Sequence, residues 1–137
     1  MDRQETGFAG CFELKCNVLS DNRGAFVKTF HNEVFEAMGL RTDWKEEYYS
    51  VSSKNVVRGM HFQTPPFEHA KLVYCLQGEV LDVVVDLRVD SPTYLQCRSF
   101  ELSPARGNSI YIPAGIAHGF LSRSEEHTSE LQSPRLS

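Results

Sequence analysis

The sequence predicts an all-β domain, a sandwich or barrel, with one short helix near its N-terminal third. Short runs rich in β-branched and aromatic residues recur along most of the chain, and glycine, proline and polar turn residues separate them. A single segment, 31–39, instead carries apolar residues at helical spacing. Many short strands at near-regular spacing are typical of a β-sandwich or barrel.

The composition limits the class of partner. A chain of 137 residues suits one domain with a hydrophobic core. Its net charge of −4 gives no reason to expect nucleic acid or an anionic membrane as a partner. No apolar run is long enough to span a bilayer, and residues 1–7 lack the apolar stretch of a signal peptide. We therefore expect a cytoplasmic protein whose four cysteines, none in C-x-x-C spacing, are reduced.

Turn signals such as "SDNRG", "DSP" and "SPARGN" divide the chain into elements. The expected strands, in chain order, are 11–19, 24–30, 46–52, 55–62, 71–77, 79–87, 93–102, 108–112 and 115–121. The helix expected at 31–39 has Val34, Phe35 and Met38 on one side, and Gly39 is expected as its C-cap.

Side chains alternate between the two faces of a strand, which makes the segment 79–87 informative. Asp82 and Asp86 share one face of it with two valines. The other face is wholly apolar, and we expect it to line a dry core; its residues are Leu81, Val83, Val85 and Leu87. The carboxylates would then face a wetter cavity or surface.

Two further strands carry cationic residues beside apolar ones. In 71–77, one face is shared by Lys71, Val73 and Cys75. In a regular strand, Arg58 and His61 would point to opposite faces. If both serve one site, we expect a bulge or twist at Gly59 between them.

The last segment differs from the rest of the chain. Residues 123–133, "RSEEHTSELQS", are polar and break the strand pattern. They also match the translation of a widely used sequencing-adapter oligonucleotide. Our hypothesis is one domain, 1–122, incomplete at its C-terminus, followed by a non-native read-through tail, 123–137. The alternative is a solvated polar tail, which is common at termini.

His61 and His118 are candidates for acid–base chemistry, because histidine titrates near neutral pH. A nearby Lys71 could stabilise an oxyanion formed when a proton leaves the carbon next to a ketone. Arg23 and Arg58 are suited to bidentate contact with a diphosphate. The alternative, from residue types alone, is a pair of satisfied core histidines with ordinary surface charges around them.

Four stretches carry a resemblance to a known family: "DNRGAFVKTF", "NVVRGMHFQTPP", "KLVYCLQGEVLDVVVDLRVDSPTY" and "IYIPAGIAHGFL". In this order, between about residues 21 and 121, the chain resembles the deoxysugar-nucleotide 3,5-epimerases. The type member of that family acts on dTDP-4-dehydro-6-deoxyglucose. The resemblance implies a cupin-type jelly roll, a homodimer, a nucleoside-diphosphate sugar as the small-molecule partner, and no metal or organic cofactor.

The resemblance also implies roles for eight residues. His61 matches the base that removes the proton next to the C4 ketone, and Lys71 matches the lysine near the ketone oxygen. Asp82 matches an inward carboxylate that we expect near Lys71, which completes the catalytic group. Arg23 matches an arginine that reaches the diphosphate, in this family often across the dimer. The expected substrate-binding residues are Arg23, Phe26, Arg58, Gln63 and His118.

Several positions depart from the family pattern. Lys28 stands where the family commonly has glutamate, and Glu46 and Tyr48 stand where the type member has glutamine and asparagine near the nucleotide. The family's proton-returning tyrosine and the aspartate that orients the base follow the "AHGF" segment. This chain has no tyrosine after Tyr111 and no aspartate after Asp90.

Metal binding is the main competing chemistry. Metal-binding cupins typically offer a His-x-His pair, a glutamate soon after it and a later histidine. Here Phe62 and Gln63 follow His61, and Lys71 follows His69 where a second histidine would stand. A cation beside a metal ion works against binding. Two further functions fit the same fold: a sugar-nucleotide 3,4-ketoisomerase and a non-catalytic sugar-nucleotide-binding module.

Overall fold

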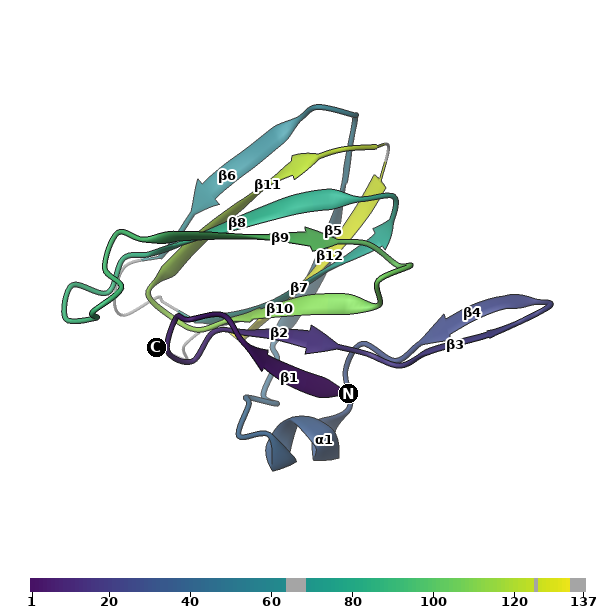
Figure 1. Cartoon of the computed structure of the whole chain (residues 1–137), viewed down its shortest axis with the longest axis horizontal. Coiled ribbons are helices and arrows are strands. Elements are labelled where there is room, and N and C mark those ends of the chain that lie inside the picture. The colour runs from purple at the N-terminus through teal and green to yellow at the C-terminus, as the bar shows by residue number, and fades with distance from the viewer. Residues whose placement is uncertain (64–68, 125, 134–137) are drawn as a thin grey trace.

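The structure is a computed structural model of the chain, and it describes residues 1–63 and 69–124 together with the backbone of 126–133. It is built almost wholly from strands, with one helix, α1, at Asn32–Ala37 (Figure 1). The strands are β1 (Asp2–Glu5), β2 (Phe12–Lys15), β3 (Val18–Asp21), β4 (Gly24–Val27), β5 (Glu46–Ser52), β6 (Val57–His61), β7 (Ala70–Gln77), β8 (Val80–Asp86), β9 (Cys97–Leu102), β10 (Asn108–Ile112), β11 (Ile116–Ser122) and β12 (Glu126–Ser133).

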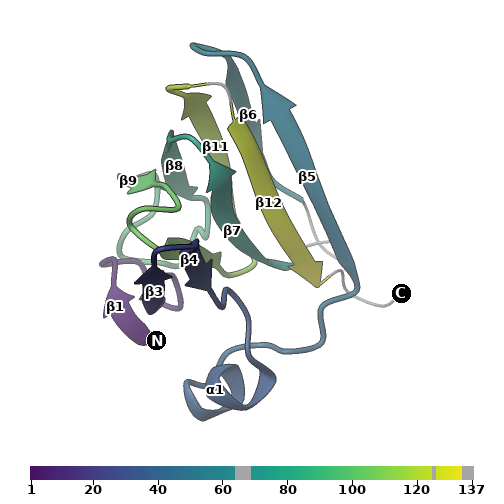
Figure 2. The same cartoon turned by 90° about the vertical axis from the view of Figure 1, so that its right-hand side faces the viewer.

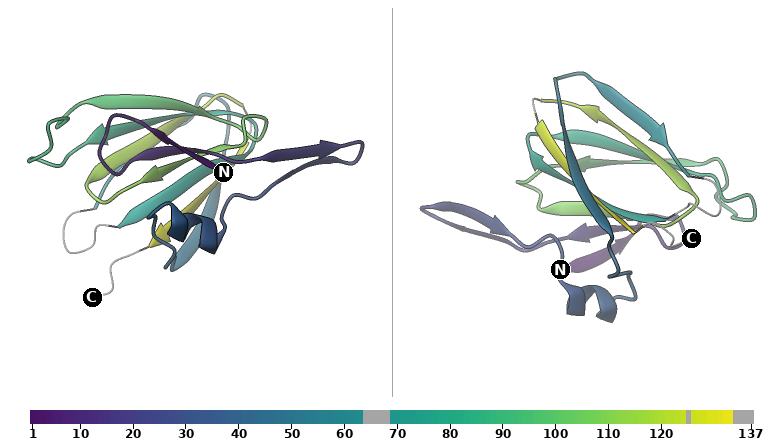
Figure 3. Two further views of the ribbon diagram at one scale, coloured as in Figure 1. Left: turned by 60° about the horizontal axis from the view of Figure 1, so that its bottom comes forward. Right: turned by 180° about the vertical axis from the view of Figure 1, so that it is seen from behind.

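Two sheets form the body of the molecule. One is six-stranded, in the order β1-β2-β10-β7-β12-β5, and the other is four-stranded, in the order β6-β11-β8-β9. The chain passes from β5 to β6 at the end of the body farthest from α1 (Figure 2). Strands β3 and β4 form a separate two-stranded ribbon that projects from the body (Figures 1 and 3). The expected all-β sandwich with one short helix is therefore confirmed.

The space between the two large sheets holds the main core. Its buried side chains come from both sheets and from the loop before β2: Phe8, Cys11, Val73, Cys75, Val80, Val84, Leu102, Ile110, Ile112 and Ile116. Alternation predicted that Lys71, Val73 and Cys75 share one face of β7, and because Val73 and Cys75 belong to this core, that face is the inward one.

A second core lies on the outer face of the six-stranded sheet. Phe35 of α1 is fully buried there against Leu72 and Tyr74 of β7. The helix ends as the sequence predicted, because Gly39 takes a φ of +74° and its amide donates to the carbonyl of Glu36. The predicted apolar side of the helix is thereby confirmed as the side that packs on the sheet.

The orientation of β8 expected from alternation was wrong, whereas the inward Asp82 that the resemblance implied is what the structure shows. Asp82 and Asp86 are fully buried together with Val80 and Val84, which belong to the core between the sheets. The residues of the wholly apolar face, Leu81, Val83, Val85 and Leu87, are only half-buried. Alternation shows which side chains share a face but not which face is inside, and each carboxylate here has polar partners that compensate its burial.

The bulge expected at Gly59 is present. In the β6–β11 pairing, Arg58 lies opposite Phe120 and His61 opposite His118, with a shift of register between them. Two residues of β6 therefore face the single Gly119 of β11, so Arg58 and His61 point to the same side of the sheet.

This bulge brings two backbones unusually close, and that leads to a stability prediction. Gly59 has a φ of +114°, and a Cβ on it would lie 2.6 Å from the Cα of Gly119. We expect Gly59→Ala to lower the free energy of unfolding by at least about 2 kcal/mol, from backbone strain and crowding together. Gly24→Ala is the control, because Gly24 has a φ of +134° but no atom within 4 Å of its added Cβ. Equal losses in urea unfolding of the two variants would contradict the role of crowding.

Other boundaries differ from the sequence expectation. The segment 11–19 forms two strands, β2 and β3, and the polar start forms β1 on the edge of the six-stranded sheet. Within the expected tail, 126–133 form β12, which pairs with both β5 and β7. Residues 125 and 134–137 of that tail lie outside the described residues, and its non-native origin stays a prediction. No helix among the described residues has the length and apolar character to cross a membrane.

Candidate active site

His118 lies at the centre of the inward face of the four-stranded sheet. It is on β11, between β6 and β8, and its side chain is almost fully buried. Its Nδ1 is 3.2 Å from the carboxylate Oδ2 of Asp82, which is fully buried on β8. A carboxylate at this distance favours the tautomer of His118 whose Nδ1–H donates to it. Nε2, on the other side of the ring, then faces away from Asp82. Asp82 was expected near Lys71; the hydrogen bond seen here joins it to His118.

His61 lies beside His118 but in a different environment. The two residues are direct partners in the antiparallel β6–β11 pairing, so their side chains lie on the same face of the sheet. His61 is exposed because β6 is the edge strand, whereas His118 is covered on both sides. The inward face of the four-stranded sheet therefore carries a buried histidine bound to a carboxylate, His118, next to an exposed histidine that solvent or a ligand can reach, His61.

Lys71 belongs to the opposite, six-stranded sheet. It lies on the inward face of β7 and is half-buried. It lines a small hollow together with Gln63, which follows β6, and Ile116, which begins β11; the other lining residues are Phe62, His69 and Gly115. Both sheets therefore contribute to this hollow, and Lys71 and Gln63 lie on it together.

Arg58 is held across the gap between the two sheets. Its Nε donates to the hydroxyl of Ser52 at 2.7 Å, and its Nη2 donates to the carbonyl of Val51 at 3.2 Å. Both acceptors lie on β5, the edge strand of the other sheet. Sequence reasoning did not single out Ser52, because a serine in a polar strand carries no signal of its contact with an arginine six residues away.

Two positions that depart from the family pattern lie on β5 near this region. Through β12, Glu46 is in register with Lys71, and Tyr48 is in register with Val73. Residues aligned across neighbouring strands share a face, so Glu46 and Tyr48 lie on the inward side of the six-stranded sheet. The carboxylate of Glu46 and the phenol of Tyr48 therefore lie on the same face of the six-stranded sheet as Lys71.

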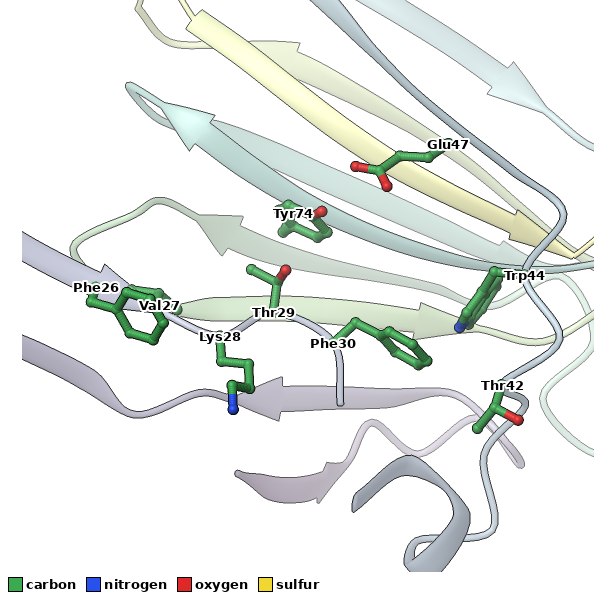
Figure 4. Close-up of a pocket in the computed structure, with 9 residues that line it drawn as sticks. All are labelled: Phe26, Val27, Lys28, Thr29, Phe30, Thr42, Trp44, Glu47 and Tyr74. Carbon is green, nitrogen blue, oxygen red and sulfur yellow. The ribbon is translucent and has the colours of Figure 1, made fainter. Parts of the chain in front are cut away.

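Arg23 and Phe26 are not brought to the other predicted residues within one chain. Both lie on the ribbon that projects from the body (Figure 3). Arg23 is in the turn between β3 and β4 and donates to the Asp21 carboxylate. Phe26 is 61% exposed. It lines a hollow of about 520 Å³ with Lys28, whereas Tyr74 and Glu47 line the side facing the ribbon (Figure 4). Since Tyr74 belongs to the outer core, this hollow lies on the face of the sheet opposite Lys71.

Two further features concern metal binding and the redox state of the cysteines. Within residues 1–63 and 69–124, no three His, Cys, Asp or Glu side chains gather in a way that could hold a metal ion. All four cysteines are free, as expected. Burial raises the pKa of the Cys11 thiol to about 11, so this cysteine stays protonated and unreactive at neutral pH.

Comparison with known proteins places this geometry in a family. The family model described as dTDP-4-dehydrorhamnose 3,5-epimerase matches residues 5–132. An enzyme of that name from Shigella flexneri is 42% identical over 116 residues, covering 84% of this chain and 63% of the relative. One from Methanothermobacter thermautotrophicus is 38% identical, covering 89% and 65%. The chain thus spans less than two thirds of the length of these curated relatives.

Solved structures agree with this result. The Bacillus anthracis dTDP-4-dehydrorhamnose 3,5-epimerase with TDP and PPi bound is 32% identical, with a TM-score of 0.92, and the match covers 99% of this chain and 79% of that one. The Legionella pneumophila dTDP-6-deoxy-D-glucose-3,5-epimerase in complex with dTDP-4-keto-L-rhamnose is 30% identical, with a TM-score of 0.91, covering 99% and 73%. The cupin-type jelly roll is confirmed, and the chain belongs to the dTDP-4-dehydrorhamnose 3,5-epimerase family.

Proposed function

We propose that this chain takes part in epimerisation of a nucleoside-diphosphate 4-keto-6-deoxysugar of the dTDP-4-dehydro-6-deoxyglucose type, within deoxysugar or rhamnose biosynthesis. The observation that carries the proposal is the pair His61 and His118, placed side by side on the inward face of one sheet, with Lys71 on the inward face of the facing sheet. The complex of the Legionella relative with dTDP-4-keto-L-rhamnose supports the substrate class.

The proposed reaction begins with removal of a proton from the carbon next to the C4 ketone. His61 is the base, because it is the exposed member of the pair and its ring is open to a ligand. The electron pair of the broken C–H bond forms a C=C bond, and the ketone oxygen becomes an enolate oxygen. The Lys71 ammonium stabilises that negative charge, and His118, held by Asp82, orients the sugar. A proton added on the opposite face restores the ketone with inverted configuration.

Arg58 is proposed to bind the diphosphate, with Gln63 beside the sugar. Arg23 and Phe26 are proposed to act on a second copy of the chain. The ribbon that carries them projects from the body, and its Leu19 and Phe26 are 64% and 61% exposed. A two-stranded ribbon with bare apolar residues is marginal alone, which supports a homodimer in which the partner covers it. The free cysteines support a cytoplasmic location.

The proposal assigns proton abstraction and enolate stabilisation to described residues of this chain. The family pattern places the proton-returning tyrosine after "AHGF", and no tyrosine follows Tyr111 here. General acid catalysis contributes about 10²–10⁴-fold. We therefore expect this chain to form the inverted product at least about 10²-fold more slowly than it exchanges the substrate proton with solvent.

Carbon NMR of the product distinguishes the proposed epimerase from a ketoisomerase. The substrate is dTDP-4-dehydro-6-deoxyglucose, and the chain is used at high concentration over hours. An epimerase leaves the carbonyl carbon at C4 and changes the configuration at C3 or C5. A product whose carbonyl has moved to C3 would contradict the proposal and favour the ketoisomerase.

We expect the protein to purify without a tightly bound transition metal. Lys71 points into the same hollow as His69, and a neighbouring cation disfavours metal binding. The measurement is elemental analysis of protein purified without chelator. Zinc or iron at one equivalent per chain would contradict this expectation and favour a metal cupin.

A further inference from the structure

Arg58 is oriented from outside its own sheet. It belongs to β6, yet the acceptors of its guanidinium lie on β5, which is the edge strand of the other sheet. Ser52 accepts from Nε at 2.7 Å, and Val51 accepts from Nη2 at 3.2 Å through its carbonyl. These two bonds fix one edge of the planar guanidinium, because Nε and Nη2 lie on the same side of it.

Ser52 stands out from the strand that carries it. Its side chain is 3% exposed, whereas Val51 beside it is 53% exposed and the following Ser53 is exposed. A buried hydroxyl needs a hydrogen-bond partner, and here that partner is the Arg58 guanidinium. The seryl oxygen therefore lies at a fixed position on the inward side, where it can hold an arginine but does not itself face solvent.

The structure shows no partner for the remaining donors of Arg58 among the side chains that it describes. Within the described residues, Arg58 donates to Ser52 and Val51, and both bonds use the Nε edge. The Nη1 donors stay on the far edge, and Arg58 as a whole is exposed. The bulge at Gly59 keeps Arg58 on the same face as His61. An anionic group bound by Nη1 would thus be held at a defined distance from His61.

We propose that Ser52 is a positioning residue that orients Arg58 for the diphosphate of the nucleotide sugar, an inference that rests on the proposed function. Ser52 does not touch the substrate; it acts through Arg58. Its hydroxyl selects one rotamer of a long side chain before the ligand arrives, so binding no longer has to order that side chain. Loss of the hydroxyl leaves the charge in place but removes its orientation.

The test measures the affinity for dTDP by isothermal titration calorimetry on the full chain. We expect Ser52→Ala to weaken dTDP binding about tenfold, as loss of one charge-assisted hydrogen bond implies, and Ser52→Thr to restore most of it. Ser53→Ala is the matched control, because Ser53 is exposed and adjacent, and it should bind dTDP like the wild type. In an Arg58→Met background, Ser52→Ala should cause no further loss, because its effect passes through Arg58.

The outcomes separate this inference from the proposed function. Wild-type binding of dTDP with no change in Ser52→Ala would overturn the positioning role and leave the proposed function standing. An equal loss from Ser52→Ala with and without Arg58 would also overturn it, because Ser52 would then act by another route. Failure of the wild-type chain to bind dTDP would contradict the proposed function and this inference together.

Discussion

Replacing His61 with alanine is expected to reduce proton exchange at the sugar by at least about 10²-fold, the usual contribution of a general base. The rate is that at which deuterium from solvent enters C3 or C5 of dTDP-4-dehydro-6-deoxyglucose, followed by proton NMR. The loss follows from geometry, because His61 is the exposed histidine on the inward face of the four-stranded sheet and is the proposed base. Lys71 cannot replace it, because Lys71 is proposed only to stabilise the negative charge of the enolate that abstraction creates.

His31→Ala is the matched control for that experiment. His31 precedes α1 and its side chain makes no capping hydrogen bond, so its loss should leave exchange unchanged. Circular dichroism and the urea midpoint of both variants show whether the fold is kept. A folded His61→Ala variant that exchanges as fast as the wild type would remove His61 from the mechanism.

Asp86→Asn is expected to lower the free energy of unfolding by about 3–5 kcal/mol, the usual cost of removing one partner from a buried ion pair. Asp86 is fully buried, and its carboxylate accepts from the backbone and guanidinium of Arg88 and from the hydroxyls of Ser91 and Thr93. The variant keeps only one of the two oxygens that accept these bonds and places an amide donor among the donors of Arg88, Ser91 and Thr93. Urea unfolding at pH 7 measures the difference.

The effect of Asp86 should depend on pH in a defined direction. Burial by itself would raise the pKa of this carboxyl, but the hydrogen bonds from Arg88, Thr93 and Ser91 outweigh burial and hold the pKa well below its usual value of 3.8. A group with a lowered folded-state pKa stabilises the protein above the unfolded-state pKa and loses that contribution as pH falls. The gap between wild type and Asp86→Asn should therefore be full above about pH 4 and shrink in more acid solution.

Asp43→Asn is the control for this prediction. Asp43 forms an ion pair with Arg41, also two residues away, but both side chains are largely exposed. Exposed pairs contribute at most about 1 kcal/mol, so this variant should unfold close to the wild-type midpoint. If the two variants lost equal stability, the buried network around Asp86 would have no special role.

The sequence predicted local features of the strands where a strand's own residues decide them. The bulge at Gly59 followed from the need to place Arg58 and His61 on one face, and the structure has it. The sharing of one face of β7 by Lys71, Val73 and Cys75 followed from alternation, and only the packing in the structure shows that this face is the inward one. Both are properties of a single strand, which a strand's own residues can specify.

Other features depend on contacts between strands far apart in the chain. Alternation by itself misjudged the inward face of β8, because burial of Asp82 depends on His118, which lies 36 residues later. The hydrogen bond from Arg58 to Ser52 likewise depends on how β5 and β6 face each other across two sheets. No periodicity in a strand reports such a partner, and polar residues in a core are recognisable only once their partners are known.

The central claim is that this chain removes the proton next to the ketone of a 4-keto-6-deoxysugar nucleotide. The direct measurement is incubation of the wild-type chain with dTDP-4-dehydro-6-deoxyglucose in deuterium oxide, with the signals of the C2, C3 and C5 protons followed by NMR. We predict loss of the C3 or C5 signal at a rate above the protein-free control, while the C2 signal keeps its intensity. Full retention of both the C3 and C5 signals, under conditions where dTDP binding is measurable, would contradict the claim.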